Sequence, residues 1–103
     1  MPDTAPILMF NALWFKPDGG AERYRDYMRA AYPIMQRHGG IKRTGGTPNM
    51  ALIGNFDADL IFFVEWPSEE AFHAFLKDPE FPAAQQLREE AITNSLLIRC
   101  APM

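Results

Sequence analysis

Glu65 is the residue of this sequence best suited to acid–base chemistry. It is the one carboxylate in a run that is otherwise apolar from Leu60 to Trp66. A carboxyl group at the end of an apolar strand loses part of its hydration, which favours proton uptake and suits a general acid or base. The alternative is a structural carboxylate, either paired with Arg43 or Arg88 or exposed at the end of the strand. Both faces of this strand are apolar, so its sequence does not indicate which face carries Glu65.

Two histidines add candidates for proton transfer. His38 lies where a predicted helix ends, so it is either a proton shuttle or a cap that the helix dipole favours when it is charged. His73 follows Phe72 in the next helix and is expected to point away from the buried side of that helix, in a structural role. The sequence holds no His-x-x-x-His or Cys-x-x-Cys spacing and no glycine-rich phosphate loop. We therefore predict no metal and no cofactor.

Aromatic side chains are numerous enough to build a pocket for a flat apolar ligand. They make up 13% of the chain, and the same residues could equally form a packed core. A pocket between a sheet and its helices would need only two or three of them. The residues predicted to line such a pocket are Trp14, Tyr24, Tyr27, Arg43, Trp66, Phe72 and Arg88.

Length and composition indicate a single globular domain over residues 1–103. The net charge is −3 and the basic residues are scattered, which argues against a nucleic acid partner. The single cysteine, Cys100, excludes an internal disulfide and favours a reducing compartment. No apolar run approaches the ~20 residues of a membrane span, and the N-terminal residues do not resemble a signal peptide. We therefore expect a cytoplasmic protein with no membrane partner.

The pattern of apolar residues predicts the first elements that position these side chains. Residues 7–15 are apolar on both alternating faces, as in a strand that is covered on both sides. Residues 21–37 have helical spacing, with a kink expected at Pro33 and a glycine cap after His38. Strand pieces at 41–44 and 50–54 are expected to flank a bulge or bend at 45–49.

The second half of the chain is predicted to repeat this order. A hairpin loop at 55–59 leads to a strand at 60–66. Ser68 is a preferred N-cap for the helix that follows. Asp78 and Pro79 are predicted to restart that helix, which then runs to about residue 93, and a last strand is expected at 96–100.

The resulting order, β-α-β-β-α-β, is typical of a ferredoxin-like α+β fold, a four-stranded antiparallel sheet with its helices on one face. The other face should be polar in a monomer. Instead, Phe62 and Val64 alternate with Ile61 and Phe63, so both sides of this strand are apolar. An uncovered apolar face of this size is unusual in monomers, and we predict a homodimer whose sheets pack face to face. The alternative is a C-terminal tail that covers this face.

The chain resembles the dimeric α/β-barrel superfamily. The shared motifs are Glu65-Trp66-Pro67-Ser68-Glu69-Glu70-Ala71, an aromatic stripe, Asp78-Pro79-Glu80-Phe81 and Arg88. His38-Gly39-Gly40 and Gly45-Gly46, at their spacings, are similar to one member, the domain of unknown function thirteen-thirty. The resemblance covers about residues 9–99 and implies a ferredoxin-like protomer and a barrel-forming dimer. That family has no settled activity, while superfamily relatives include cofactor-free monooxygenases, muconolactone isomerase-like enzymes, haem-degrading enzymes and larger dye-decolourising peroxidases.

These observations leave three functions open. The first is a homodimer that binds a small apolar or aromatic molecule. The second is a cofactor-independent monooxygenase or isomerase acting on a small aromatic or polyketide-like substrate, with Glu65 or His38 handling a proton. The third is a structural or regulatory domain with no ligand. An enclosed pocket favours the first two functions over the third, and an inward-pointing Glu65 or His38 favours the second.

Overall fold

The computed structural model describes residues 5–103. Residues 1–4, on which the expectation about a signal peptide partly rests, lie outside the described residues. Within this range no helix is long and apolar enough to cross a membrane. The elements follow one another as β1 (Ile7–Phe15), α1 (Gly20–Arg37), β2 (Ile41–Gly46), β3 (Leu60–Trp66), α2 (Glu69–Leu76), α3 (Phe81–Ala91) and β4 (Ile92–Cys100).

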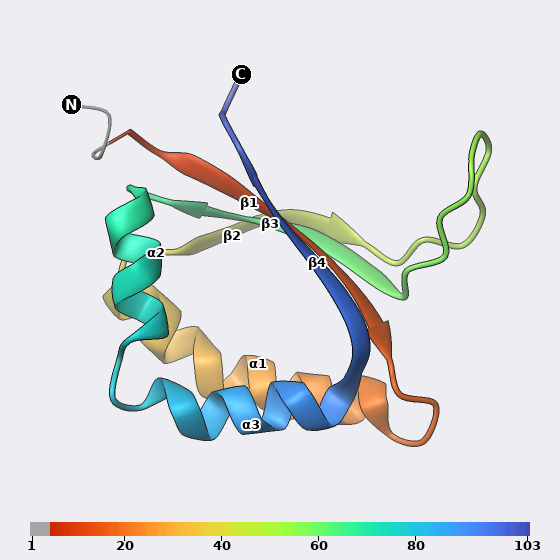
Figure 1. The fold of residues 1–103 in the computed structure, drawn as a ribbon, viewed down its shortest axis with the longest axis horizontal. Coiled ribbons are helices and arrows are strands. Elements are labelled where there is room, and N and C mark those ends of the chain that lie inside the picture. The colour runs from red at the N-terminus through yellow and green to blue at the C-terminus, as the bar shows by residue number, and fades with distance from the viewer. Residues whose placement is uncertain (1–4) are drawn as a thin grey trace.

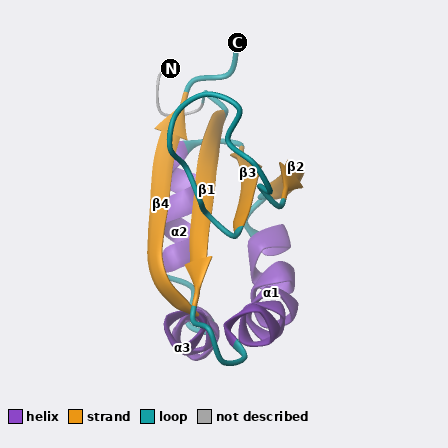
Figure 2. Ribbon diagram, turned by 90° about the vertical axis from the view of Figure 1, so that its right-hand side faces the viewer, coloured by secondary structure: helices purple, strands orange, loops and turns teal. Residues whose placement is uncertain are grey.

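The strands form one antiparallel sheet in the order β2-β3-β1-β4. All three helices lie on the same side of this sheet (Figure 1, Figure 2). This arrangement confirms the prediction of a ferredoxin-like α+β fold, including the helix break between α2 and α3. Because β1 lies between β3 and β4, its residues occupy the middle of both sheet faces.

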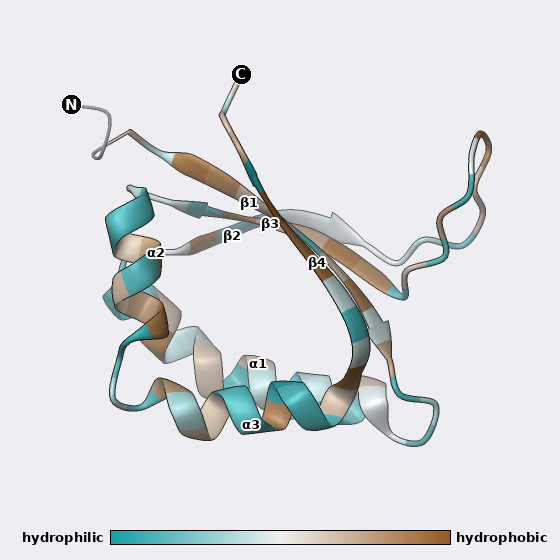
Figure 3. Cartoon of the chain, viewed as in Figure 1, coloured by the Kyte–Doolittle hydropathy of each residue, from teal (hydrophilic) through white to brown (hydrophobic). Residues whose placement is uncertain are grey.

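Alternation along β3 divides its side chains between the two faces of the sheet. Phe62, Val64 and Trp66 are buried on the helix side. Ile61, Phe63 and Glu65 therefore point to the opposite side, which we call the open face. Figure 3 shows hydrophobic residues along β1, β3 and the middle of β4. The open face therefore carries the apolar side chains of Ile61 and Phe63, although no helix or strand of residues 5–103 covers it.

Helix α1 follows a turn in which Gly19 has a φ of 81°, a conformation that favours glycine. The helix continues through Pro33. Beyond its end, Gly39 has a φ of 82° and the Gly40 amide donates a hydrogen bond to the Met35 carbonyl at 3.0 Å, which confirms the predicted glycine cap. The buried residues of α1 recur at helical spacing and face the sheet and α3: Tyr24, Tyr27, Ala31, Ile34 and Met35.

Two side-chain oxygens accept hydrogen bonds from backbone amides between β3 and α3, near the starts of α2 and α3. The Ser68 hydroxyl accepts a hydrogen bond from the Ala71 amide at 3.1 Å, as predicted for an N-cap. The Asp78 carboxylate accepts one from the Glu80 amide at 2.9 Å, and α3 begins directly afterwards at Phe81. Asp78 thus ends the α2 segment and positions the start of α3.

The last helix is shorter, and the last strand longer, than the sequence predicted. Helix α3 ends at Ala91 and the backbone is already extended at Ile92, so β4 begins four residues before the predicted position of 96. The physical reason is tertiary pairing. β4 pairs with β1 from Cys100 back to Ile92, opposite Phe15, and this ladder replaces the last helical turn.

The bulge or bend predicted at residues 45–49 lies partly within β2, because this strand continues through Gly45 and Gly46. The pairing of β2 with β3 shifts its register between Lys42 and Gly45, as in a β-bulge. A β-carbon at Gly45 would lie 2.6 Å from the Ile61 carbonyl oxygen. Glycine therefore allows the two backbones to approach here.

The predicted strand at residues 50–54 is absent from the structure, where a loop spans residues 47–59. Two aspartates connect this loop to β1 through side-chain contacts. The Trp14 indole donates to the Asp57 carboxylate at 2.9 Å, and the Phe15 amide donates to the Asp59 carboxylate at 2.8 Å. These contacts hold the end of the loop without a strand ladder. The loop projects on the side of the sheet away from the helices (Figure 1).

Candidate functional site

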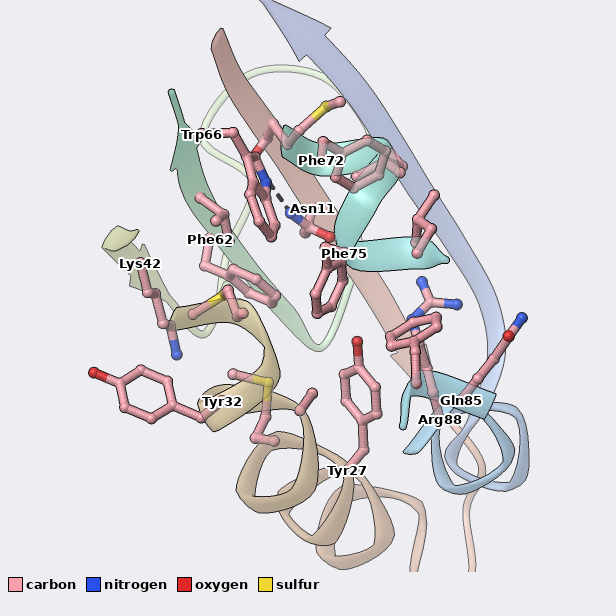
Figure 4. Close-up of a pocket in the computed structure, with 18 of the residues that line it drawn as sticks. Asn11, Tyr27, Tyr32, Lys42, Phe62, Trp66, Phe72, Phe75, Gln85 and Arg88 are labelled. Carbon is pink, nitrogen blue, oxygen red and sulfur yellow. Dashed lines mark hydrogen bonds between the residues drawn. The ribbon is translucent and has the colours of Figure 1, made fainter. Parts of the chain in front are cut away.

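A cavity of about 230 Å³ lies between the helices and the sheet. Side chains from β1, β2, β3 and β4 form its roof, and side chains from α1, α2 and α3 form its walls (Figure 4). Protein cores normally contain few voids larger than a water molecule. The cavity is therefore the first candidate for a ligand site in this fold.

Aromatic rings form the central part of the cavity wall. The Trp66 ring centroid lies 5.0 Å from that of Phe75 and 5.5 Å from that of Phe72. Phe75 is in turn 4.7 Å from Phe81. Tilted and edge-on arrangements at these separations are the favoured geometry of aromatic pairs. This cluster fixes the shape of the wall that joins α2, α3 and the sheet.

A few polar groups interrupt this apolar lining. They are the Asn11 amide, the hydroxyls of Tyr24, Tyr27 and Tyr32, the Gln85 amide, the Lys42 ammonium and the Arg88 guanidinium. Asn11 donates a hydrogen bond to the Met9 carbonyl at 3.3 Å. Among the described residues, no aspartate, glutamate or histidine lines the cavity. Its charged groups are thus cations only.

Two tyrosines of α1 stay neutral inside the cavity wall. Burial raises the pKa of Tyr24 and the pKa of Tyr27 above their ordinary value of 10.0. The neighbouring Tyr27 further raises the pKa of Tyr24, whereas the charge of Arg88 lowers the pKa at both positions. At pH 7 both phenols are therefore protonated and can donate hydrogen bonds.

Five of the seven predicted pocket residues line this cavity, namely Tyr24, Tyr27, Trp66, Phe72 and Arg88. Trp14 does not, because it points to the open face and contacts Asp57 and Phe56 of the loop at 47–59. Arg43 does not either, since it lies on the open face of β2. The structure thus brings together the five predicted residues on the helix side of the sheet and separates the two on its open face.

Glu65 lies on the open face, away from the cavity. Its carboxylate accepts a hydrogen bond from the Arg43 Nε at 2.9 Å, and its side chain is 34% exposed. This is the ion pair that the structural alternative named. A catalytic role for Glu65 stays a prediction, and any substrate that it serves would lie outside the cavity between helices and sheet.

His38 is part of a polar cluster between the end of α1 and the start of α3. Its Nε2 lies 2.8 Å from an Asp78 carboxylate oxygen, and Arg37 donates to the same carboxylate at 3.1 Å. Arg37 also pairs with Glu80 at 3.2 Å. The Asp78 side chain is 8% exposed, and its nearly buried charge is satisfied by His38, by Arg37 and by the backbone amide of Glu80. His38 does not line the cavity, and its role in proton transfer stays a prediction.

Replacing Asp78 with asparagine should lower stability at neutral pH. The hydrogen bond from the Glu80 amide, followed by those from His38 and Arg37, lowers the pKa of Asp78 from 3.8 to about 2. Because this pKa is depressed in the folded state, its stabilising contribution is present above about pH 4 and is lost as the pH falls toward 2. Urea unfolding of the Asp78→Asn protein should show a lower midpoint than the original chain at pH 7.

The difference between the two midpoints should shrink as the pH falls from 4 to 2. Asp18→Asn, at an exposed turn, is the matched control and should leave the midpoint close to that of the original chain at pH 7. A midpoint of Asp78→Asn that equals the original at pH 7 would contradict this account of the cluster.

The other histidine and the cysteine also lie outside the cavity. His73 contacts Glu69 at 3.3 Å on the exposed side of α2, and Glu69 also pairs with Arg99. Cys100 is a free thiol at the end of β4. Among residues 5–103, no group of three or more potential ligand side chains could hold a metal ion.

Sequence reasoning missed several lining residues. The most informative of these are Asn11 and Lys42, from two strands, and Gln85 from α3. Asn11 had a signal in the sequence, since it is the one polar residue within the apolar strand at 7–15. Lys42 alternates with Ile41 and Arg43, but β2 is exposed along its length and its pattern did not indicate which side faces the helices.

Comparison with known proteins assigns the family. A family model described as Domain of unknown function (DUF1330) matches residues 19–100. The chain belongs to the DUF1330 family. This confirms the resemblance inferred from its glycine pairs and its strand-to-helix motif. None of the curated proteins matches the chain.

Solved structures agree with this assignment. A protein of unknown function from Rhodopseudomonas palustris is 34% identical, with a TM-score of 0.90, over 97% of this DUF1330 chain and 84% of that chain. A dimeric ferredoxin-like protein of unknown function from Jannaschia sp. is 13% identical with a TM-score of 0.77, over 95% and 100% of the two chains. A candidate antibiotic biosynthesis monooxygenase from Bacteroides thetaiotaomicron is 13% identical with a TM-score of 0.71, over 96% and 90%. The last two similarities show the fold alone.

Proposed function

We propose that this DUF1330 protein binds a small apolar or aromatic molecule in the cavity between its helices and its sheet. The observation that carries this proposal is the volume of about 230 Å³ behind an aromatic wall. An apolar cavity of about 150 Å³ holds benzene, whereas pockets for drug-sized molecules span about 300–1,000 Å³. A molecule with one aromatic ring or a similar apolar body is therefore the size that suits the cavity.

Methionine methyl groups offer a direct test of this binding. Met9, Met28 and Met35 line the cavity, whereas Met50 is exposed in the loop at 47–59. On titration of methyl-labelled protein with phenylacetamide, a neutral single-ring probe, NMR should show saturable shifts at the three cavity methyl groups. The Met50 signal should stay in place. Uniformly small shifts at all four positions would contradict binding in the cavity.

A pair of substitutions in α1 provides the control for this titration. Ala31 lines the cavity, and the neighbouring Ala30 is exposed on the same helix. Ala31→Leu fills part of the space and should weaken phenylacetamide binding by about tenfold or more, because an occupied cavity admits a ligand only with strain. Ala30→Leu should bind like the original chain. Equal affinities in both variants would place the probe elsewhere.

The proposal includes a homodimer formed through the open face. The ring centroids of Phe10 and Phe63 lie 5.4 Å apart on that face, with the rings tilted, and the neighbouring Leu96 and Ile98 of β4 are 40% and 47% exposed. An apolar surface of this kind on a small domain favours burial against a second copy. Two solved proteins of the same fold, from Jannaschia sp. and Bacteroides fragilis, are described as dimeric.

A second candidate function is a cofactor-independent oxygenase or isomerase reaction on the bound molecule. It is favoured by the fold shared with the candidate monooxygenase from Bacteroides thetaiotaomicron. Within the cavity the phenols of Tyr24 and Tyr27 are among the hydrogen-bond donors available to orient a polar substituent. Proton abstraction by Glu65 or His38 would need the substrate to reach beyond the cavity. Binding is therefore the function that we place first.

A further inference from the structure

The charged groups that line the cavity have one sign. Lys42 from β2 and Arg88 from α3 lie on opposite sides of it (Figure 4). No carboxylate or histidine of the described residues joins them in the lining. Lys42 is exposed, so solvent screens its charge, whereas Arg88 is partly buried and gives the cavity most of its positive potential.

Arg88 differs from most other arginines of the chain in its pairing. Arg23, Arg29, Arg37, Arg43 and Arg99 each form an ion pair with a carboxylate. Arg88 is partly buried, and within residues 5–103 it has no carboxylate partner. Removing a charge from water without a counter-ion is costly, so a partly buried guanidinium favours the arrival of an anion.

Hydrogen-bond donors accompany this guanidinium. Tyr27 projects from α1 with its hydroxyl toward the interior of the cavity, on the side where Arg88 lies (Figure 4). Tyr24 and Tyr27 are both close enough to Arg88 for its charge to affect them. A guanidinium with a protonated phenol nearby offers several donors and no negative charge. A planar carboxylate, which accepts bidentate hydrogen bonds, complements this set.

We propose that the cavity takes a small apolar carboxylate, with one aromatic ring or an equivalent apolar body, whose carboxylate group binds Arg88. This inference rests on the proposed function and names the ligand class of the same site. The ring occupies the space beside Trp66 and Phe75, and the carboxylate points to α3. Lys42, whose ammonium lies 5.0 Å from the Phe62 ring centroid, adds positive charge from the opposite side.

The test compares two probes of the same shape, phenylacetate and phenylacetamide, in the methionine-methyl titration at pH 7. Phenylacetate should bind about tenfold tighter or more, because hydrogen bonds to charged groups are stronger than neutral ones. In Arg88→Met, which keeps a long apolar stem, this preference should fall to about twofold or less, because phenylacetate loses more affinity than phenylacetamide does. Arg25→Met, at an exposed position of α1, should behave like the original chain.

The possible results distinguish the proposal that the cavity binds a ligand from the proposal that this ligand is a carboxylate. If both probes bind equally, or if Arg88→Met keeps the preference for the carboxylate, the assignment of the ligand class is overturned while binding in the cavity stands. If neither probe shifts the cavity methyl groups, the proposed function falls together with this inference. A circular dichroism spectrum like that of the original chain, together with saturable phenylacetamide shifts at the cavity methyl groups, shows that Arg88→Met is folded, so a lost preference supports the role of Arg88.

Discussion

Replacing Trp66 with alanine should destabilise the protein by about 3–5 kcal/mol, the usual cost of removing a large buried ring. Trp66 is 2% exposed and joins three parts of the fold. Its ring packs against Phe72 and Phe75 of α2 on one side. On the other side it lies so close to the chain after α1 that a β-carbon at Gly40 would be 2.8 Å from it.

Urea unfolding followed by circular dichroism measures this loss. Since small domains are stable by only about 5–15 kcal/mol, Trp66→Ala should remove a large share of the total. Phe56→Ala is the comparison, because Phe56 is 42% exposed and its one aromatic contact is with Trp14. That change should cost about 1 kcal/mol. Similar losses in the two variants would show that the cluster around Trp66 does not hold the helices to the sheet.

Replacing Phe63 with glutamate should convert the proposed dimer into a monomer. Phe63 packs against Phe10 on the open face, so a two-fold symmetric interface would bring the substituted side chain into the contact from both copies. Burying an unpaired carboxylate and losing an aromatic anchor should raise the dissociation constant by about a hundredfold or more. The change leaves the helix side of β3 untouched, so the fold should persist.

Light scattering during size-exclusion chromatography reports the outcome. The original chain should have twice the chain mass of 11.7 kDa at micromolar concentration, and Phe63→Glu should have the mass of one chain. Ala83→Glu introduces the same charge on the exposed side of α3 and should remain dimeric. A monomeric original chain would refute the dimer, and a dimeric Phe63→Glu protein would move the interface to another surface.

Local patterns in the sequence predicted most of the fold. The alternation in β1 and β3, the helical spacing of α1 and the Ser68 cap each depend on neighbouring residues, so they are visible without a structure. The prediction of a strand at 50–54 also used only local residues, and it was wrong. Its apolar residues Leu52 and Ile53 are 86% and 98% exposed, and the loop is held instead by Asp57 and Asp59 contacting β1, which no local pattern indicates.

The residues of the candidate site also differ in whether a local pattern or the tertiary structure places them. Tyr24, Tyr27 and Phe72 were predicted as pocket residues because they are aromatic, and they line the cavity because helical spacing puts them on the buried sides of their helices. Trp14 and Arg43 were predicted on residue type alone, and the pleat of the sheet puts them on the open face. Residue type identifies candidate pocket residues, whereas the face of the sheet on which each one lies decides whether it lines the cavity.

Glu65 illustrates what only the tertiary structure decided. By itself the sequence determined that a carboxylate occurs in an apolar strand and that Phe62, Val64 and Trp66 share one face of it. It did not determine which face meets the helices, because both are apolar and a strand has no local feature that distinguishes them. Packing of α1, α2 and α3 makes that choice. It leaves Glu65 with Arg43 on the open face and gives the cavity Arg88 and Lys42 as its charged groups.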